Sequence, residues 1–325
     1  MPVFNGAALL ERSLTSLLRQ TYQNIEIVIL DNLSTDATRE ICERFAVEDK
    51  RVQYHLDTRQ RITHDAANQL AEFARGAYCF AASDDDLWEP SFIEALITPM
   101  QEDPSIDLVF CDCMWIDTDD VVFGRRFLNR HERTTLGNGP FRFWWTYLMR
   151  RNVVPVIFGL YKTSAWRASI PFKTFDISIA DVDNLFVLKF AAQNKIAIVP
   201  RVLFKYRYRD RDIKSLANVP DFRGKASNLN LYLYALRHQV RFTNEIFAVL
   251  SASKFSFREK VLLRLRVIYS FGIQLLVKYW VSRLHTALIN RSRSNALSMK
   301  LSSMRSAHII QQWKTSTDDQ FSKNN

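Results

Sequence analysis

The chain has 325 residues, 47% of them apolar, and a formal net charge of +10. This length predicts one large domain or two, with enough apolar side chains to bury a sizeable core. No charged start leads into an apolar run and a cleavage site, so we expect a cytoplasmic protein rather than a secreted one. The four cysteines lack the partner pairs of a zinc site and are expected to pack in the core. They are Cys42, Cys79, Cys111 and Cys113.

The positive charge lies in the last third of the chain. Residues 221–325 contain 17 Lys and Arg against 5 Asp and Glu, whereas residues 1–220 contain 27 against 29. The first two thirds therefore have the charge balance of an ordinary enzyme domain, and the last third that of a segment that meets an anionic surface. No nucleic-acid-binding motif is visible, and we expect no nucleic acid partner.

Helices and strands alternate over the first part of the chain. Leucines at i, i+4, i+7 and i+8 predict a helix over 8–20, and the apolar run 25–30 predicts a strand buried on both faces. Further helices are expected over 37–45, 64–74 and 90–101, and further strands over 52–55, 78–82 and 107–111. This alternation is typical of an open α/β sheet, in which ligands bind beyond the carboxyl ends of the strands.

Carboxylates follow two of the expected strands. Asp31 comes directly after the run 25–30, and the triplet Asp84, Asp85 and Asp86 follows the strand over 78–82. Three adjacent like charges repel one another unless a cation lies among them, and a hard divalent ion bound through oxygens suits them. A solvated acidic turn is the alternative. Because both groups lie at carboxyl ends of strands, one crevice could hold both.

Six features then occur in a characteristic order. They are P-x-F-N-G at 2–6, the leucine-patterned helix, Q-T-Y-x-N-I-E-I-V-I at 20–29, L-D-N-x-S-T-D-x-T at 30–38, N-x5-A-x-G-x-Y at 68–78 and S-D-D-D-x-W-x-P at 83–90. With them, about residues 1–210 resemble the family 2 glycosyltransferases of GT-A fold. The resemblance implies a Rossmann-like open mixed sheet with flanking helices and inverting transfer of a sugar from a nucleotide sugar, with a UDP-sugar expected. It also implies Mg²⁺ or Mn²⁺ as cofactor, and as acceptor a hydroxyl of a cell-surface polysaccharide or lipid-linked saccharide.

The resemblance assigns residues to the nucleotide sugar. They are Pro2, Phe4, Asn5, Asp31, Asn68, Asp84, Arg207 and Arg209. Asp31 is expected to accept a hydrogen bond from the base or ribose, since a carboxylate suits the N3–H donor of uracil. The alternative for Asp31 is a helix-capping or turn residue. Asn32 and Leu33 stand where the family more often has Asp and Gly.

The resemblance also assigns the metal ligands. Ser83 stands where the first Asp of D-x-D-D is common, so we expect Asp85 to bind the metal, Asp86 to support it and Asp84 to lie near the ribose. A divalent ion there would stabilise the charge on the leaving diphosphate. The stretch 117–120 also contains D-x-D, but a polar hairpin turn is the favoured interpretation.

Two carboxylates are candidates for the general base. By resemblance the base opens a helix, and Asp181 is the better match, with Asp183 as the alternative. An inverting displacement needs a carboxylate that takes the proton of the attacking hydroxyl. A helix N-terminal Asp stabilised by the helix dipole is the structural alternative. Further on, Arg209 stands where the family often has His, and Arg207 and Arg209 are expected phosphate contacts, with solvated charges as the alternative.

Three parts are expected: a catalytic domain over 1–215, a basic amphipathic helical region over 216–290 and a polar tail over 291–325. Ser256 and Glu259 form the capping-box pattern S-x-x-E. Basic residues beside an apolar stripe suit a helix on an anionic membrane, so we expect peripheral association with the inner face of the cell membrane. A helical cap packed on the catalytic domain is the alternative.

The family's apolar first strand before P-x-F-N is absent from the sequence, and Met1 takes its last position. Because that strand would be central in a sheet, its loss would expose backbone groups of its neighbours. We expect either a start further upstream or a truncated, inactive relative that only binds nucleotide or a partner. A nucleotidyltransferase is a third possibility, but its Gly/Arg-rich phosphate loop is not present near the start.

Overall fold

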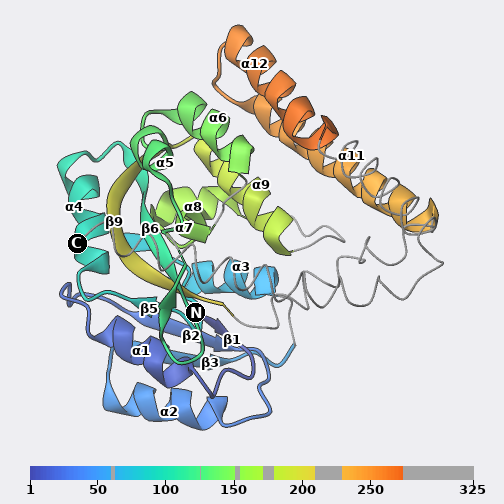
Figure 1. Cartoon of the computed structure of the whole chain (residues 1–325). Helices are drawn as coiled ribbons and strands as arrows, with labels where there is room; N and C mark the ends of the chain where they lie inside the picture. The colour runs from blue at the N-terminus through green and yellow to red at the C-terminus, as the bar shows by residue number, and fades with distance from the viewer. Residues whose placement is uncertain (60–62, 125, 151–153, 171–178, 209–228, 274–325) are drawn as a thin grey trace, which may run out of the picture. The chain divides into compact units, whose positions relative to one another are not determined.

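The computed structural model describes residues 1–59, 63–124, 126–150, 154–170, 179–208 and 229–273 (Figure 1). The chain divides into two compact units, one of Met1–Val219 with Arg237–Phe271 and one of Pro220–Leu236 with Gly272–Asn325. In the second unit, the described residues are those that begin helix α11 and the pair 272–273. The expected boundaries near 215 and 290, the polar tail and Arg209 lie outside the described residues.

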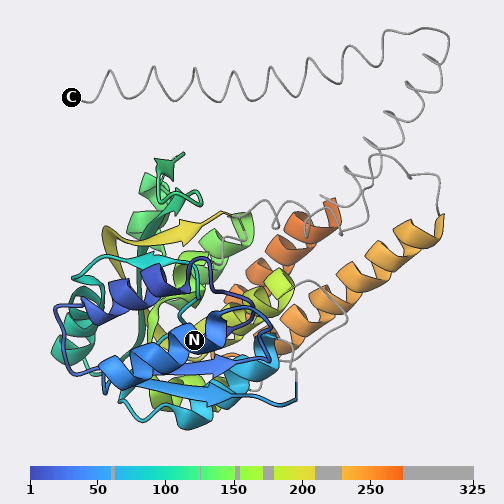
Figure 2. The ribbon, with the colours of Figure 1, turned by 90° about the horizontal axis from the view of Figure 1, so that it is seen from below.

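The first sheet is parallel, with strand order β1-β2-β3. The strands are β1 (Pro2–Val3), β2 (Ile27–Asp31) and β3 (Val52–Leu56), and the helices that follow them are α1 (Leu10–Leu18), α2 (Thr38–Glu48) and α3 (Thr63–Phe73). In Figure 1, α2 lies below this sheet and α3 above it, and from below, the two blue helices α1 and α2 lie in front of the strands (Figure 2). The strand–helix alternation expected for this region is confirmed.

Strand β1 is short and lies at the edge of the first sheet, where both of its residues pair with β2. Pro2 and Val3 lie opposite Leu30 and Asp31, and the main-chain oxygens of Met1 and Val3 accept hydrogen bonds from the N–H groups of Leu30 (3.0 Å) and Asn32 (2.9 Å). The motif P-x-F-N-G therefore begins in a strand of the sheet and continues into a loop at its carboxyl end.

The second sheet is mixed, with strand order β4-β8-β6-β9-β5 and with β7 paired to β6. Its strands are β4 (Tyr78–Cys79), β5 (Leu87–Trp88), β6 (Ile106–Ile116), β7 (Val122–Phe123), β8 (Leu160–Lys162) and β9 (Lys195–Arg207). Strands β6 and β9 are parallel, and the other pairs are antiparallel. The expected open mixed sheet is thus confirmed.

Strand β6 separates two apolar cores. Its residues Leu108 and Phe110 face a cluster formed with the helices after residue 140, whereas Val109, Cys111 and Cys113 face a cluster formed with α1 and α4. Alternate residues point to opposite faces of a strand, so the continuous apolar run 108–111 of β6 is buried on both sides. The remaining helices are α4 (Phe92–Glu102), α5 (Arg130–Thr135), α6 (Pro140–Arg150), α7 (Val154–Ile157), α8 (Thr163–Ser169), α9 (Ile179–Ala191), α11 (Leu229–Ala252), α12 (Phe257–Val267) and the π-helical segment η1 (Ile268–Ile273).

One strand differs from its expectation. We expected a buried strand over 78–82, but β4 contains only Tyr78 and Cys79, and both are half-buried. The reason is its place at the edge of the second sheet, where only Lys162 and Tyr161 of β8 pair with it. The residues after Cys79 are therefore free to run as a loop toward the acidic triplet.

Two smaller expectations are confirmed. All four cysteines are free thiols, three of them buried. Ser256 and Glu259 form the expected capping box, in which each side chain bonds the backbone N–H of the other residue. Within the described residues, no helix has the length and apolar content needed to cross a membrane.

Candidate functional site

Two loops meet at the carboxyl ends of β1 and β2. Asn5 Oδ1 accepts a hydrogen bond from the backbone N–H of Thr35 (2.8 Å), and the Asn5 N–H donates to Ser34 Oγ (2.9 Å). The Gly6 N–H donates to Thr38 Oγ1 (2.9 Å). The loop that carries Phe4 and Asn5 is thereby fixed to the loop that follows Asp31. These are the two loops that the resemblance assigns to the nucleotide.

Both loops contain a residue in left-handed backbone conformation. Asn5 has a φ of 50° and Leu33 a φ of 61°. Asn adopts this conformation readily, but for Leu it is unfavourable. Leu33 is the position at which the family more often has Gly, and the positive φ explains why a glycine suits it. Phe4, which precedes Asn5 in the first loop, is 49% exposed. Pro2 is half-buried in β1.

Asp31 is fully buried at the end of β2. Its Oδ1 accepts a hydrogen bond from the Ser34 N–H (2.9 Å) and its Oδ2 one from the Tyr54 hydroxyl (3.0 Å). Burial, together with this bond to a carboxylate, raises the pKa of Tyr54 above its ordinary value. Oδ1 of Asp31 thus stabilises the loop that follows it, as the turn-residue interpretation expects, while Oδ2 connects β2 to Tyr54 of β3. The contact of Asp31 with a nucleotide stays a prediction.

The acidic loop, residues Ser83–Asp86, lies against α1. The Ser13 hydroxyl donates to the main-chain oxygen of Asp86 (2.5 Å), and Ser16 Oγ accepts from the Trp88 N–H (3.3 Å). After the loop, β5 pairs with β9, so that Leu87 lies opposite Lys205 and Trp88 opposite Phe204. The acidic loop is therefore held at both sides, by a helix that follows the P-x-F-N-G motif and by a strand of the second sheet.

The acidic loop also meets the first loop directly. A β-carbon added to Gly6 would lie 2.3 Å from Asp84 Oδ2, closer than any ordinary contact. Gly6 is thus required by the close approach of the two segments. This juxtaposition brings the triplet, which lies in the loop between β4 and β5, to the edge of the first sheet where β1 and β2 end.

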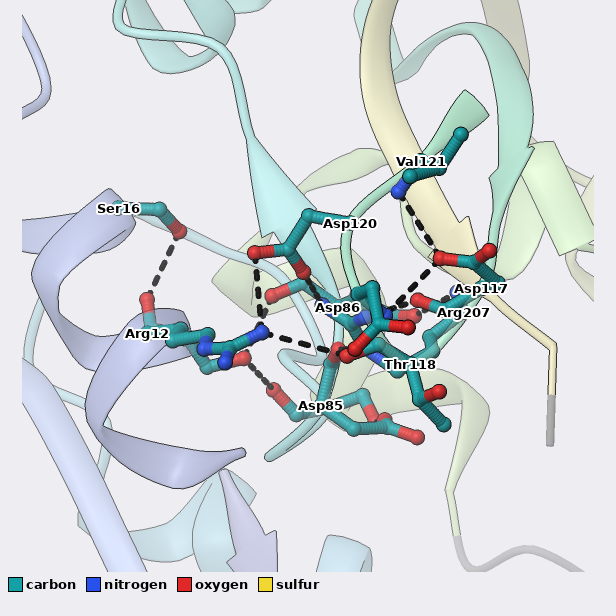
Figure 3. Close-up of polar contacts among 12 residues, drawn as sticks. Arg12, Ser16, Asp85, Asp86, Asp117, Thr118, Asp120, Val121 and Arg207 are labelled. Carbon is teal, nitrogen blue, oxygen red and sulfur yellow. Dashed lines mark hydrogen bonds and ion pairs between the residues drawn. The ribbon is translucent and has the colours of Figure 1, made fainter. Parts of the chain in front are cut away.

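Arg207, the last residue of β9, is the central donor of the site (Figure 3). Its N–H donates to Asp86 Oδ1 (2.7 Å) and its Nε to the main-chain oxygen of Asp85 (2.6 Å). Its two terminal nitrogens donate to the main-chain oxygen of Asp117 and to Asp120 Oδ1. With 1% of its surface exposed, Arg207 binds groups of the protein on every side of its guanidinium.

The stretch 117–120 is a hairpin turn, as expected. It joins β6 to β7, and Asp117 and Val121 are connected by a main-chain hydrogen bond of 3.1 Å. The turn has a further role that the sequence did not predict. Asp120 bonds Arg207 with one oxygen and Arg12 of α1 with the other (3.2 Å). The sequence did not predict the roles of Arg12, Ser13 and Asp120. Their neighbouring residues do not indicate that Asp120 bonds Arg12 and Arg207, or that Ser13 bonds the acidic loop.

The carboxylates of the acidic loop differ in their surroundings. Asp86 is fully buried, and burial and the nearby charge of Asp85 raise its pKa well above the ordinary value. Among the described residues, Asp86 Oδ2 has no hydrogen-bond partner. Asp85 is half-buried and accepts a hydrogen bond from the Ser83 hydroxyl. Ser83, which replaces the first Asp of the usual motif, is thus used to orient the next but one carboxylate.

These surroundings suit a divalent cation that is bound largely through its substrate. In the part of the chain that the structure describes, no three Asp, Glu, His or Cys side chains form a metal-binding group. Mg²⁺ and similar ions in nucleotide sites, however, use one or two carboxylates together with phosphate oxygens. The half-buried Asp85 and the unsatisfied buried oxygen of Asp86 provide such a partial set.

The remaining expected residues lie on other elements. Asn68, on α3, lines an open pocket of about 330 Å³ together with Arg59, Asp65, Gln69 and Glu72. Asp181 and Asp183 lie in the first turns of α9. The Asp181 side chain lies outside the described residues, whereas Asp183 is half-buried, and its charge contributes to the raised pKa of the buried Tyr161, after burial itself and Cys79. The choice between the two as base stays open.

Comparison with known proteins decides the family. The family described as Glycosyl transferase family 2 matches residues 1–158. Residues 1–158 belong to glycosyl transferase family 2. The matched part of the chain contains both loops, the acidic loop and the turn 117–120. The residues of α9 and β9 lie beyond it, so their roles rest on the resemblance of their own motifs.

Related sequences are named as glycosyltransferases. Glycosyltransferase GlyG of Streptococcus pneumoniae serotype 4 is 34% identical over 102 residues, which cover 31% of this chain and 34% of GlyG. A PGL/p-HBAD biosynthesis glycosyltransferase of Mycobacterium tuberculosis is 34% identical over 166 residues, which cover 47% of this chain and 64% of that protein. The chain thus matches about a third of the first relative and just under two thirds of the second.

Solved structures establish the fold. TarS 1-349 of S. aureus, in complex with UDP-GlcNAc, superposes with a TM-score of 0.59 at 16% identity, over 83% of this chain and 71% of that one. The mannosyltransferase PcManGT of Pyrobaculum calidifontis, in complex with GDP-Man and Mn²⁺, superposes with a TM-score of 0.53 at 17% identity, over 98% and 81% of the two chains. The family 2 domain therefore has the GT-A fold that its motifs imply.

Proposed function

We propose that the chain is a metal-dependent, inverting glycosyltransferase. It moves a sugar from a nucleotide donor, with a UDP-sugar as the first expectation, to a hydroxyl of a cell-surface glycan or lipid-linked saccharide. The observation that carries this proposal is the contact between Gly6 and Asp84, which joins the nucleotide loops of a family 2 domain to three carboxylates. The nucleotide sugars bound to TarS and PcManGT support the donor class.

On the donor side, the exposed ring of Phe4 and the rigid loop of Asn5 would receive the base, with Asp31 as acceptor for its N–H. Asp84, beside Gly6, would lie near the ribose. Asn68 of α3 would contact the donor from the pocket that it lines with Arg59 and Asp65. Phe4, Asn5 and Asp31 come from the carboxyl ends of the adjacent strands β1 and β2, where nucleotides bind in open α/β sheets.

On the phosphate side, Arg207 and Arg209 have different proposed tasks. The guanidinium of Arg207 holds the acidic loop through Asp85 and the turn through Asp120, so we assign it a positioning role toward the diphosphate. Arg209, two residues further on, is the proposed direct phosphate contact. Asp85 and Asp86 would hold Mg²⁺ or Mn²⁺, which supplies positive charge for the leaving diphosphate.

The transfer itself needs one proton acceptor. The acceptor hydroxyl oxygen attacks the anomeric carbon, and the bond between that carbon and the phosphate oxygen breaks, so that the nucleoside diphosphate leaves with the electron pair. The hydroxyl proton passes to a carboxylate of α9, for which Asp181 is preferred to Asp183. Attack opposite to the leaving group inverts the anomeric configuration. The proposed place of action is the cytoplasmic face of the membrane, where nucleotide sugars and lipid-linked acceptors meet.

The experiment that tests this proposal measures donor turnover and donor binding separately. Purified protein is incubated with UDP-glucose, UDP-galactose, UDP-GlcNAc and GDP-mannose, with Mn²⁺ or with EDTA, and released nucleoside diphosphate is quantified. Calorimetry on the same samples measures binding. Metal-dependent release from at least one donor supports the enzyme. Binding without release would favour the inactive relative that only binds nucleotide.

The base is assigned with two variants. If Asp181 is the base, Asp181→Asn lowers transfer by about 10²–10⁴-fold, the usual contribution of a general base, while nucleotide binding is retained. Asp183→Asn then serves as the matched control on the same helix. The reverse pattern would assign the base to Asp183.

A further inference from the structure

Helix α12 has two apolar faces, one buried in the core and one exposed on the surface. Leu263 and Val267 are fully buried in the core that also contains Trp144 of α6. On the opposite side of the helix, a second set of apolar residues is exposed at spacings of four, four and three to four residues. This set, here termed the apolar stripe, is Phe257 (82% exposed), Val261 (38%), Leu265 (59%), Ile268 (52%) and Tyr269 (57%).

The spacing places the stripe on a single face. Residues at i, i+4, i+8 and i+11 of a helix lie above one another, and the stripe continues from α12 into η1 without a polar interruption at these positions. Isolated exposed apolar side chains are ordinary on a protein surface, but a continuous row marks an interaction site. Buried residues on the other side of the helix show that core packing does not require the stripe.

Cations surround the stripe. The stretch 254–266 contains five Lys or Arg and a single carboxylate, Glu259, which caps the helix by accepting from the Ser256 N–H (2.8 Å). The cations are Lys254, Arg258, Lys260, Arg264 and Arg266. Lys260 and Arg264 bond the neutral Ser251, to its main-chain oxygen (3.0 Å) and its hydroxyl (2.8 Å) respectively. Over the described residues, none of the five cations is ion-paired with a carboxylate.

An aromatic contact keeps one of these cations beside the stripe. The guanidinium of Arg266 lies over the ring of Trp145, 4.7 Å from its centroid, and 5.8 Å from that of Tyr269. The contact with the rings orients the charge without neutralising it. Trp145 is itself 38% exposed. An apolar row with aromatic residues and unpaired cations at its border is the pattern of helices that lie in a membrane interface.

We propose that the apolar stripe binds the surface of a membrane that contains anionic lipids. The positive charge around the stripe favours a membrane over a second copy of the chain. A second copy of the chain seated on the stripe would bring two sets of five cations together, whereas anionic headgroups would neutralise them while the apolar side chains enter the acyl boundary. The inference rests on the proposed function only in that a lipid-linked acceptor would be met at the same surface. Membrane binding is measured without donor turnover, so that each can fail alone.

The test is sedimentation with vesicles of two compositions, phosphatidylcholine alone and phosphatidylcholine with about a third phosphatidylglycerol. A triple variant, Val261→Ser with Leu265→Ser and Ile268→Ser, removes the centre of the stripe. Its control replaces three exposed valines elsewhere, Val47→Ser with Val121→Ser and Val240→Ser. All six side chains are exposed, so both variants should fold, which circular dichroism checks. Donor turnover in solution should be unchanged in both.

The expected result is binding of the wild type to anionic vesicles, at least tenfold weaker binding of the stripe variant and a change below twofold in the control. Weaker binding to phosphatidylcholine alone and a decline with salt are also expected. Three results would overturn the proposal: no sedimentation of the wild type, equal sedimentation of the stripe variant, or a wild-type dimer that the stripe variant converts to monomer. The last result would assign the stripe to a second copy of the chain.

Discussion

The Nε of Arg207 donates a 2.6 Å hydrogen bond to the main-chain oxygen of Asp85, at the centre of the acidic loop. Because the same guanidinium also bonds the turn through Asp117 and Asp120, three segments far apart in the sequence depend on one buried side chain. The geometry of the carboxylates is thus set from β9 as well as from their own loop.

Replacing Arg207 by lysine tests this dependence. Lysine keeps the charge but has a single ammonium where the guanidinium reaches three acceptors. We expect Arg207→Lys to lower the free energy of unfolding by about 2 kcal/mol, the cost of buried acceptors left unsatisfied, and to raise the KM for Mn²⁺ and donor several-fold. Urea unfolding and steady-state kinetics measure the two effects. Arg201→Lys, at an exposed position of β9, is the control, and equal behaviour of the two variants would contradict the assigned role.

The contact between Gly6 and Asp84 predicts a coupled pair of substitutions. An added β-carbon would lie 2.3 Å from Asp84 Oδ2 and 3.1 Å from Val3 Cγ1. Gly6→Ala is therefore expected to cost about 1–3 kcal/mol of stability by overpacking. In the double variant with Asp84→Ala, which removes the colliding oxygen, more than half of that cost should be recovered. Thermal unfolding of the two single variants and the double variant measures the coupling. Simple additivity would show that the close approach does not exist.

The left-handed backbone conformation of Leu33 predicts that a glycine at this position is tolerated. Its φ of 61° costs a leucine roughly 1–2 kcal/mol, whereas glycine adopts it freely and loses more chain entropy on folding. Leu33→Gly should therefore change the free energy of unfolding by less than about 1 kcal/mol, with either sign. Leu262→Gly, at an exposed position inside α12, should destabilise by about 1 kcal/mol. A clearly larger loss at position 33 than at 262 would speak against the left-handed conformation.

Glu26 predicts a pH dependence of stability. Partial burial acts to raise its pKa, but the N–H groups of Arg75 and Gly76 and the amide of Gln53 outweigh burial, so that the pKa is lowered. A lowered pKa in the folded state stabilises the fold above the unfolded value of about 4.3, and the gain disappears as pH falls through the folded value. Relative to Glu26→Gln, the wild type should be more stable by about 1–2 kcal/mol at pH 7, and the difference should close below about pH 4.

Urea unfolding of both proteins across pH 3–8 measures this difference. Glu48→Gln is the matched control. The Glu48 side chain is 56% exposed, and its ion pair with Arg44 on the same helix is long, at 3.8 Å, so its charge should contribute little to stability. Its difference from the wild type should stay within about 0.5 kcal/mol at every pH. A Glu26→Gln difference that is constant with pH would mean that the carboxylate charge does not contribute.

The elements and the acidic loop were predictable because their signals are local. The run 25–30 predicted a buried strand, and β2 is Ile27–Asp31. The leucine spacing predicted α1. The order of short motifs placed Asp31 at a strand end, as observed, whereas the triplet lies in the loop between β4 and β5. These signals need only neighbouring residues. The strand expected over 107–111 extends to Ile106–Ile116, since its partner β9, of 13 residues, pairs with it from Ile106 to Ile116.

The partners of the acidic loop were not predictable, because they depend on strand pairing between distant segments. Arg207 meets Asp120 only because β9 runs parallel to β6, which ends at the turn. Arg12 meets Asp120 across 108 residues of sequence. The edge position of β4 likewise depends on β8, a strand more than 80 residues away. No periodicity or local motif contains such information.

The most direct test of the active site is the rate of nucleoside diphosphate release by Asp85→Asn compared with Asp119→Asn. Asp119 lies in the turn beside the site, and its exposed carboxylate has no place in the proposed chemistry. We predict that Asp85→Asn lowers Mn²⁺-dependent release at least about 100-fold, as expected when a preorganised charge that stabilises the transition state is lost, while Asp119→Asn stays within about twofold of the wild type. Release by Asp85→Asn at the rate of Asp119→Asn would contradict the acidic loop as the catalytic centre.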